Sequence, residues 1–254
     1  MQQAEFKNIV ISGASSGIGA ELAIQLAGAG VHLCLLGRDE ARLSDIAQKC
    51  QANGAETSTH IIDVRNDQEM KELLLALDEK HAFDLVIASA GVGRQYEDTD
   101  FIRLTTEINV FGVLNMVEPL LPKLKERQSG QVAVLSSLAG FRTFGRPAGY
   151  SASKAWVRLY GEALRGQYAK YGVGVSVVCP GFVKTPMVQN APKNMSVMPV
   201  EEAAGKIITG LKRNKGRIIF PWHQAFFIWL ISVLPTSWLE KYFIKKWTSV
   251  KLQF

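Results

Sequence analysis

The chain has 254 residues, a formal net charge of +6 and 47% hydrophobic residues. This length suits one α/β domain or two small ones, and the apolar content supplies a sizeable core. Cys34, Cys50 and Cys179 match no metal or redox spacing, so we expect reduced, buried thiols in a cytoplasmic protein and no metal. The opening residues lack the regions of a signal peptide. No nucleic-acid-binding signature accompanies the positive charge, so we expect no nucleic-acid partner.

Short apolar strands alternate with longer helical segments along most of the chain. The expected strands cover residues 8–13, 31–37, 58–63, 84–90, 131–137, 174–180 and 216–221. The expected helices cover residues 18–30, 39–54, 66–80, 104–127, 150–171 and 200–213. This alternation predicts an α/β fold, a Rossmann-like doubly wound parallel sheet of about seven strands with helices on both faces.

A glycine-rich turn, SGASSGIG at residues 12–19, follows the first expected strand. Glycines permit a tight turn and a close backbone approach to a pyrophosphate, and the helix that follows offers free N–H groups to an anion. The spacing of Gly13, Gly17 and Gly19 departs from the commoner G-x-G-x-x-G pattern. Because a strand precedes the turn and a helix follows it, a dinucleotide site is favoured over a tight turn without a ligand.

The second expected strand ends at Gly37-Arg38-Asp39, where such folds discriminate between NAD and NADP. An acidic residue here binds the ribose hydroxyls of NAD, whereas an arginine accommodates the 2′-phosphate of NADP. Gly37 stands where the acid would be, and the Arg38 guanidinium can fork onto a phosphate, which favours NADP over NAD. Asp39 leaves an alternative, because it could bind the ribose with Arg38 directed to solvent, or cap the next helix.

Tyr150 and Lys154 lie four residues apart at the start of a long helical run. Residues at this spacing share one helix face. Taken alone, the pair is typical of a solvated helix surface, so its meaning depends on the motifs elsewhere in the chain.

Together with the glycine turn, this pair resembles the short-chain dehydrogenase/reductase family over roughly residues 6–221. Further matches are Asp63 after the third strand, ASAG at 88–91, Asn109, LSS at 135–137 and PGFVKTP at 180–186. The resemblance implies a single-domain Rossmann-like fold that oxidises alcohols or reduces carbonyls with NAD(P). It also implies a small-molecule carbonyl or alcohol substrate and a homo-oligomer, a dimer or tetramer, often formed through the helices after the fourth and fifth strands.

The chemistry of carbonyl reduction explains the catalytic residue types. A proton must reach the developing alkoxide, and the resemblance assigns this transfer to Tyr150. A lysine cation one turn away, with the oxidised nicotinamide also positive, is expected to lower the pKa of Tyr150. The resemblance implies that Lys154 also bonds the nicotinamide ribose, that Ser137 holds the substrate oxygen, and that Asn109 holds a water linking the lysine to solvent.

The resemblance further implies a set of cofactor-binding residues. They are Gly13, Ser15, Ser16, Gly17, Ile18, Gly19, Arg38, Asp63, Val64, Ala90, Gly91, Tyr150, Lys154, Pro180, Gly181, Val183 and Thr185. Asp63 and Val64 are expected to meet the adenine, and Thr185 the nicotinamide carboxamide. The chain departs from the family at Ala88-Ser89, where two asparagines are common, and at Ser12, where threonine is usual.

Substrate specificity is expected at the carboxyl ends of the strands, where open α/β sheets bind ligands. This rim would include residues 93–96, 138–147 and 187–199, the last of which resembles the mobile loop that closes over substrate in the family. Phe141, Phe144, Met187, Met195 and Met198 either favour an apolar ligand or pack loop against core.

Residues 222–254 form a hydrophobic extension. No residue from Ile218 to Leu239 is formally charged, His223 apart, and lysines follow. A spanning helix needs about 20 apolar residues, whereas Pro221 and Pro235 enclose only 13, so we expect no membrane span. Three interpretations remain: a cover over the substrate site or a subunit contact, a peripheral membrane contact through tryptophans and lysines, or completion of the core.

These features favour an NADP-dependent oxidoreductase that interconverts a carbonyl and an alcohol by hydride transfer, on an apolar or lipid-like substrate. We expect residues 1–221 to form the dinucleotide-binding and catalytic domain, with 222–254 as a helical extension of it. A non-catalytic NAD(P)-binding sensor or scaffold on the same fold is the alternative. The complete set of Ser137, Tyr150, Lys154 and Asn109 argues for the enzyme, because a binding module has no need of it.

Overall fold

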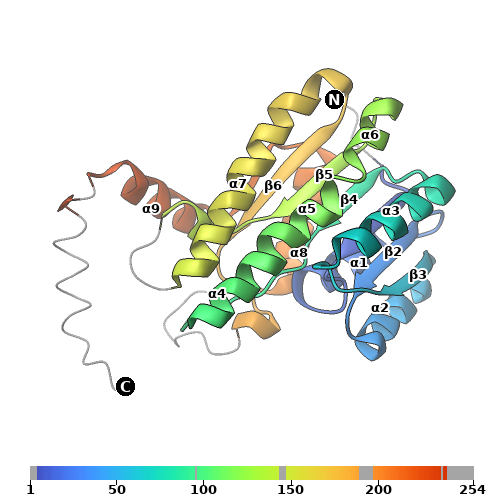
Figure 1. The fold of residues 1–254 in the computed structure, drawn as a ribbon, viewed down its shortest axis with the longest axis horizontal. Coiled ribbons are helices and arrows are strands. Elements are labelled where there is room, and N and C mark those ends of the chain that lie inside the picture. Colours follow the sequence, from blue (N-terminus) through green and yellow to red (C-terminus); the bar gives the residue numbers. More distant parts are fainter. Residues whose placement is uncertain (1–4, 95, 143–146, 189–196, 236, 239–254) are drawn as a thin grey trace.

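The computed structural model describes residues 5–94, 96–142, 147–188, 197–235 and 237–238. A seven-stranded sheet lies between two layers of helices (Figure 1). Its strands are β1 (Asn8–Ser12), β2 (His32–Gly37), β3 (Glu56–Ile61), β4 (Leu85–Ala88), β5 (Gln131–Leu135), β6 (Gly174–Pro180) and β7 (Arg217–Phe220). All pairings are parallel, in the order β3-β2-β1-β4-β5-β6-β7. The predicted doubly wound α/β fold is confirmed.

The helices cover both faces of the sheet. They are α1 (Gly17–Leu26), α2 (Glu40–Ala52), α3 (Asp67–His81), α4 (Thr99–Thr106), α5 (Gly112–Val117), α6 (Leu121–Arg127), α7 (Ala148–Tyr168), α8 (Val200–Lys212) and α9 (Trp222–Val233). Strand side chains alternate between two cores, as the two-residue period requires. Ile9 and Ile11 pack with residues of α1, α2 and α8, whereas Val10 packs with residues of α3, α5 and α7.

The expected continuous helix over 104–127 is wrong in detail. The chain forms α4, a π-helical turn at Glu107–Phe111, α5 and then a separate α6. Pro119 and Pro122 lie around the break, and proline removes a backbone donor and clashes with the preceding turn. The π-helical turn contains Asn109, and such turns are frequent at functional sites.

The carboxyl ends of the strands meet at one edge of the sheet. The strand order reverses between β1 and β4, which makes this edge the expected ligand site of an open α/β fold. Cys34, Cys50 and Cys179 are buried free thiols, as expected.

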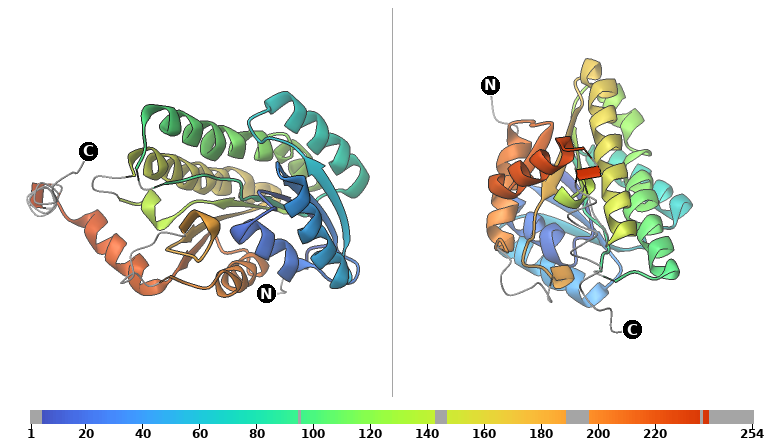
Figure 2. Two further views of the ribbon diagram at one scale, coloured as in Figure 1. Left: turned by 90° about the horizontal axis from the view of Figure 1, so that it is seen from below. Right: turned by 90° about the vertical axis from the view of Figure 1, so that its left-hand side faces the viewer.

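Helix α9 extends from one end of the molecule (Figure 2). It contacts β7 and the short 3₁₀ turn at Leu138–Gly140, and Arg142 Nη1 donates to the Ser232 carbonyl at 3.2 Å. Large apolar side chains remain exposed along α9, among them Phe226, Phe227 and Trp229. Within the described ranges, no helix has the length and apolar character needed to cross a membrane. Residues 239–254 of the predicted extension lie outside the described part of the chain.

Candidate active site

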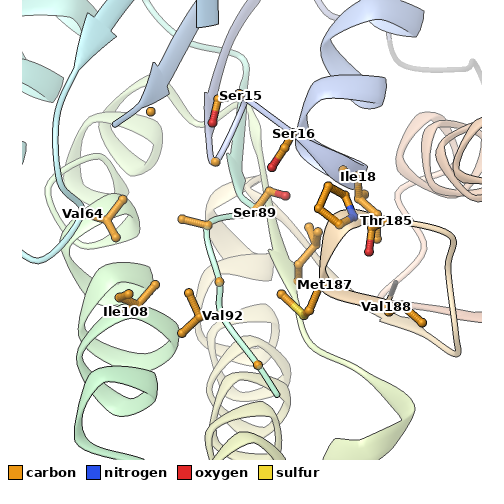
Figure 3. Close-up of a pocket in the computed structure, with 18 of the residues that line it drawn as sticks. Ser15, Ser16, Ile18, Val64, Ser89, Val92, Ile108, Thr185, Met187 and Val188 are labelled. Carbon is orange, nitrogen blue, oxygen red and sulfur yellow. The ribbon is translucent and has the colours of Figure 1, made fainter. Parts of the chain in front are cut away.

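A cleft of about 940 Å³ opens at the carboxyl edge of the sheet. Segments that follow β1, β2, β3, β4, β5 and β6 line it, together with the start of α7. Figure 3 shows the hydroxyl groups of Ser15, Ser16 and Ser89 on one side and the apolar side chains of Val92, Ile108 and Met187 on the other. The cleft thus has a polar part and an apolar part.

The glycine turn forms the polar part. Gly13 has φ +68°, and a Cβ there would lie 2.7 Å from the Ala90 Cα, so a side chain is excluded. A Cβ at Gly19 would lie 2.3 Å from the Gly13 carbonyl oxygen. Because glycine lacks this atom, α1 can pack directly against the turn. The Ser16 side chain accepts no N–H of α1. The free N–H groups and the positive end of the helix dipole therefore face the cleft and fit a pyrophosphate.

The structure brings most of the predicted site residues together. Those lining the cleft are Gly13, Ser15, Ser16, Gly17, Ile18, Arg38, Asp63, Val64, Ala90, Gly91, Ser137, Tyr150, Lys154, Pro180, Gly181, Val183 and Thr185. Gly19 and Asn109 do not line it and lie behind the wall. The chain departs from the family at Ser12 and at Ala88-Ser89, yet the two segments remain bonded to each other. The Ser12 hydroxyl accepts the Ser89 and Ala90 N–H groups at 3.2 and 3.4 Å.

Of the two residues that follow β2, Asp39 bonds to helix α2 and Arg38 lies at the cleft. Asp39 caps α2, accepting the Arg42 backbone N–H at 3.0 Å and the Arg42 Nε at 2.7 Å. These bonds lower the pKa of Asp39. Arg38 remains largely exposed beside the cleft, with Nη1 at 3.6 Å from a carboxylate oxygen of Asp63. Arg65 binds the same carboxylate at 2.7 Å and is the main reason that the pKa of Asp63 is lowered.

Tyr150 lies in the first turn of α7, facing the cleft. Burial raises the pKa of its phenol, and a hydrogen bond with the Ser137 hydroxyl opposes that rise. The expectation that Lys154 lowers the pKa of Tyr150 is therefore wrong for the protein by itself. Desolvation outweighs the favourable contacts, because the charged phenolate is disfavoured away from water.

Lys154 is buried one turn further along α7. Its Nζ donates to the Leu135 carbonyl at 2.8 Å and lies 5.8 Å from the centroid of the Tyr150 ring. Burial lowers its pKa to about 8. A Cβ at Gly91 would lie 3.3 Å from this amine, so the backbone after β4 passes directly over Lys154.

Asn109 ties three elements together from the π-helical turn. Its side chain accepts the Val92 N–H at 2.8 Å and donates to the Val92 carbonyl at 2.9 Å. It also donates to the Ser153 hydroxyl at 3.0 Å, which in turn donates to the Tyr150 carbonyl at 2.7 Å. Through its side chain Asn109 thus holds the β4 end and α7 in place.

Asp39, the alternative ribose ligand of the sequence analysis, also lines the cleft. Several further lining residues were not singled out from the sequence as cofactor or catalytic residues. They are Gly37, Glu40, Arg42, Ile62, Ser89, Val92, Gly93, Arg94, Phe101, Ile108, Leu135, Ser136, Pro186, Met187 and Val188. Most of them are next to a predicted motif in the sequence. Their position near the ends of the expected strands could have indicated that they line the cleft. Ile108 and Phe101 come from helical segments, so only the tertiary structure brings them to the cleft. Phe144 and Met195 lie outside the described residues, as do positions 95, 143–146 and 189–196 of the expected rim.

Known proteins are similar to this chain in sequence and in fold. The sequence model of the short chain dehydrogenase family matches residues 7–196. An uncharacterized oxidoreductase of Myxococcus xanthus is 34% identical over 92% of this chain and 95% of that protein. A fatty acyl-CoA reductase of Acinetobacter baylyi is 28% identical over 84% of this chain and 75% of its own length. The solved structure of a short-chain dehydrogenase from Sphingobium yanoikuyae in complex with NADPH has a TM-score of 0.79 and 21% identity, covering 98% of this chain and 96% of that chain, which shows the fold.

The chain therefore belongs to the short-chain dehydrogenase family and is an oxidoreductase of that family. Its members bind NAD(P) and act on small molecules. The cleft fits such a cofactor, because side-chain-free glycines and the uncapped start of α1 border it.

Proposed function

We propose that the protein is an NADP-dependent oxidoreductase that interconverts a carbonyl and an alcohol on an apolar or lipid-like substrate. The Tyr150 phenol and the Ser137 hydroxyl, which both line the cleft, together with the buried Lys154 amine one turn from Tyr150, carry this proposal. NADPH oxidation with a panel of apolar ketones and aldehydes tests it. NADPH binding without turnover of any of them would favour the sensor alternative.

In this mechanism the bound cofactor supplies or accepts the hydride. Ser137 and Tyr150 hold the substrate oxygen, and the Tyr150 phenol donates a proton to it in reduction or accepts one in oxidation. The buried Lys154 ammonium sits one turn from the phenol, where its charge stabilises a developing phenolate. Asn109 fixes the geometry of the β4 end and α7, so that both partners are held in place before substrate arrives.

The contacts after β2 support NADP over NAD. Asp39, the alternative ribose ligand, is engaged in capping α2 and binding Arg42, which supports Arg38 as the cofactor contact. A Cβ at Gly37 would lie 3.4 Å from the Ser15 side chain, so the absence of a side chain leaves room beside Ser15 and Arg38. A guanidinium and a hydroxyl next to that space suit a phosphate.

The substitution Arg38→Ala should weaken NADPH binding about ten- to a hundredfold, because a charge-assisted hydrogen bond contributes about 1.5–3 kcal/mol. Fluorescence titration of the purified protein with NADPH and NADH measures this. NADH binding by the same variant is the internal control and should stay within about twofold of the wild type. An equal loss for both cofactors would mean that Arg38 does not contact the 2′-phosphate.

The apolar half of the cleft supports an apolar substrate. Val92, Phe101, Ile108 and Val188 line it, and Met187 is 45% exposed at its side. The similarity to a fatty acyl-CoA reductase is in keeping with a lipid-like substrate. We also propose a homo-oligomer, since apolar side chains such as Phe111 and Leu159 are exposed on the helices expected to form a subunit contact.

Helix α9 supports a peripheral contact with an anionic membrane as an extension of the catalytic domain. Trp222, Phe226 and Trp229 are each more than half exposed, and aromatic side chains suit the membrane interface. The sequence after α9 contains Lys241, Lys245, Lys246 and Lys251 against a single glutamate, a charge that attracts anionic lipid.

The double substitution Phe226→Ser with Trp229→Ser should lower partition onto phosphatidylglycerol vesicles at least about tenfold, because each buried aromatic contributes about 1.5–3 kcal/mol. Vesicle co-sedimentation measures this, with Ile61→Ser on the exposed edge strand β3 as the control. The membrane contact would be contradicted if the wild-type protein did not co-sediment with the vesicles. It would also be contradicted if the double substitution changed only the oligomeric state.

A further inference from the structure

The start of α7 obtains its cap from a distant part of the chain. The helix begins at Ala148 after Pro147, whose side chain has no oxygen that could accept an N–H. Instead, the Glu97 carboxylate accepts the Gly149 N–H at 2.7 Å and the Tyr150 N–H at 2.9 Å. One oxygen serves each donor, and the negative charge lies at the positive end of the helix dipole.

Glu97 is itself held in place by its neighbours in the segment between β4 and α4. Asp98 caps α4, accepting the Phe101 N–H at 2.8 Å, and also binds Arg94 Nη2 at 2.6 Å. The Arg94 guanidinium lies 3.9 Å from the centroid of the Phe101 ring. The carboxylate is thus presented by an anchored segment and is partly buried.

The same segment also contacts the side chain of Tyr150. A Cβ at Gly93 would lie 2.6 Å from Cδ2 of the tyrosine ring, so the backbone at Gly93 packs directly on that ring. A Cβ at Gly149 would lie 3.0 Å from Ile102 of α4 and 3.3 Å from the Glu97 carboxylate, so Gly149 lets α4 and Glu97 approach the helix start. Backbone and ring of Tyr150 are therefore both fixed from the segment that lines the substrate side of the cleft.

We propose that Glu97 is a positioning residue for Tyr150, holding the first turn of α7 against the β4–α4 segment so that the phenol faces the Ser137 hydroxyl. The inference rests on the proposed function, which makes Tyr150 the acid and base. Tyr150 lies in the first turn of α7, so a movement of that turn would displace the phenol, and a misplacement of about 1 Å can cost about a hundredfold in rate. A tie that reaches across from another element prevents this movement.

The substitution Glu97→Ala should lower kcat about thirty- to a hundredfold, and Glu97→Gln about tenfold, because the amide keeps one acceptor oxygen. The NADPH dissociation constant should stay within about twofold of the wild type, since Glu97 does not line the cofactor half of the cleft. Asp100→Asn, which removes the same charge from the first turn of α4, is the matched control and should leave kcat unchanged.

A second variant separates positioning from simple helix capping. Adding Pro147→Asp to Glu97→Ala supplies a cap from the residue before the helix. The melting temperature should then recover while kcat stays low, because a local cap does not tie α7 to the β4–α4 segment. Recovery of kcat together with the melting temperature would overturn the inference.

Two measurements do not depend on turnover. The Gly149 and Tyr150 amides should exchange their hydrogens slowly in the wild type and rapidly in Glu97→Ala. A tyrosinate absorbance titration, taken as the difference from Tyr150→Phe, should give a higher pKa for Tyr150 in Glu97→Ala than in Glu97→Gln. Both variants lose the charge, so this difference reports the lost contact with Ser137. If the wild type turns over no carbonyl, the proposed function fails. The role of Glu97 is overturned independently if amide hydrogen exchange in Glu97→Ala equals that of the wild type, or if the Tyr150 pKa is equal in Glu97→Ala and Glu97→Gln.

Discussion

Tyr150→Phe should keep NADPH binding and lose turnover by about 10²- to 10⁴-fold, the usual contribution of a general acid or base. The substitution removes one oxygen at the cleft wall and leaves the ring packed against Gly93. The proton then has no donor within reach of the substrate oxygen, while the glycine turn and Arg38 remain intact. Steady-state NADPH oxidation with an apolar ketone, beside a fluorescence titration of NADPH, measures both quantities.

The pH dependence of this reaction follows from the same residue. Burial raises the pKa of Tyr150 above its ordinary value, so the phenol stays protonated at neutral pH. Reduction needs the protonated phenol, so its rate should not fall at neutral pH through deprotonation of Tyr150.

The control for Tyr150→Phe is Tyr168→Phe, on the same helix but far from the cleft. Equal activity of Tyr150→Phe and Tyr168→Phe would remove Tyr150 as the acid.

Lys154→Met should abolish turnover and yet stabilise the protein at pH 7. The pKa of Lys154 falls from 10.5 to about 8 on folding because the amine is buried, and this shift corresponds to about 3 kcal/mol against the charged form. Losing the donor to the Leu135 carbonyl at 2.8 Å costs about 1–2 kcal/mol. The net gain in the free energy of unfolding at pH 7 is then about 1–2 kcal/mol.

The sign of the pH effect separates this explanation from a general change in packing. Between pH 8 and 10.5 the unfolded chain binds more protons at Lys154 than the folded protein does, so the stability of the wild type rises with pH in that window. Lys154→Met lacks this rise, and its advantage should vanish by about pH 10.5. Urea unfolding at several pH values measures it, with the exposed Lys49→Met as control. A constant advantage across this range would contradict a buried ammonium.

The sequence identified the fold and most of the cleft because both depend on local patterns. A parallel sheet buried on both faces requires apolar strands between helices, and the chain shows seven such strands. Gly13 must lack a side chain because Ala90 lies against it, and this constraint is visible as a glycine motif. Ser137, Tyr150 and Lys154 were instead identified through the resemblance to the short-chain dehydrogenase/reductase family, whose motifs can be matched along the chain.

Other features depend on distant segments and could not be inferred in this way. The sequence left open whether Asp39 binds ribose or caps a helix, and the structure shows that it caps α2 and binds Arg42. The continuous helix expected over 104–127 breaks beside Pro119 and Pro122, and the sequence also did not indicate the π-helical turn whose Asn109 side chain bonds Val92 and Ser153, which lie far away in sequence. In the protein by itself the pKa of Tyr150 is raised rather than lowered, because desolvation depends on what surrounds the phenol and outweighs the lysine four residues later.

By itself, the sequence determined a doubly wound α/β sheet and a glycine turn suited to a dinucleotide, because periodicity and glycine conformation are local properties. The tertiary structure alone decided how these residues are held. Glu97 contacts the start of α7 from 52 residues away, and Arg142 binds the end of α9 from 90 residues away. Such contacts depend on the packing of whole elements, whose energy is shared among many side chains and is not encoded in any short stretch.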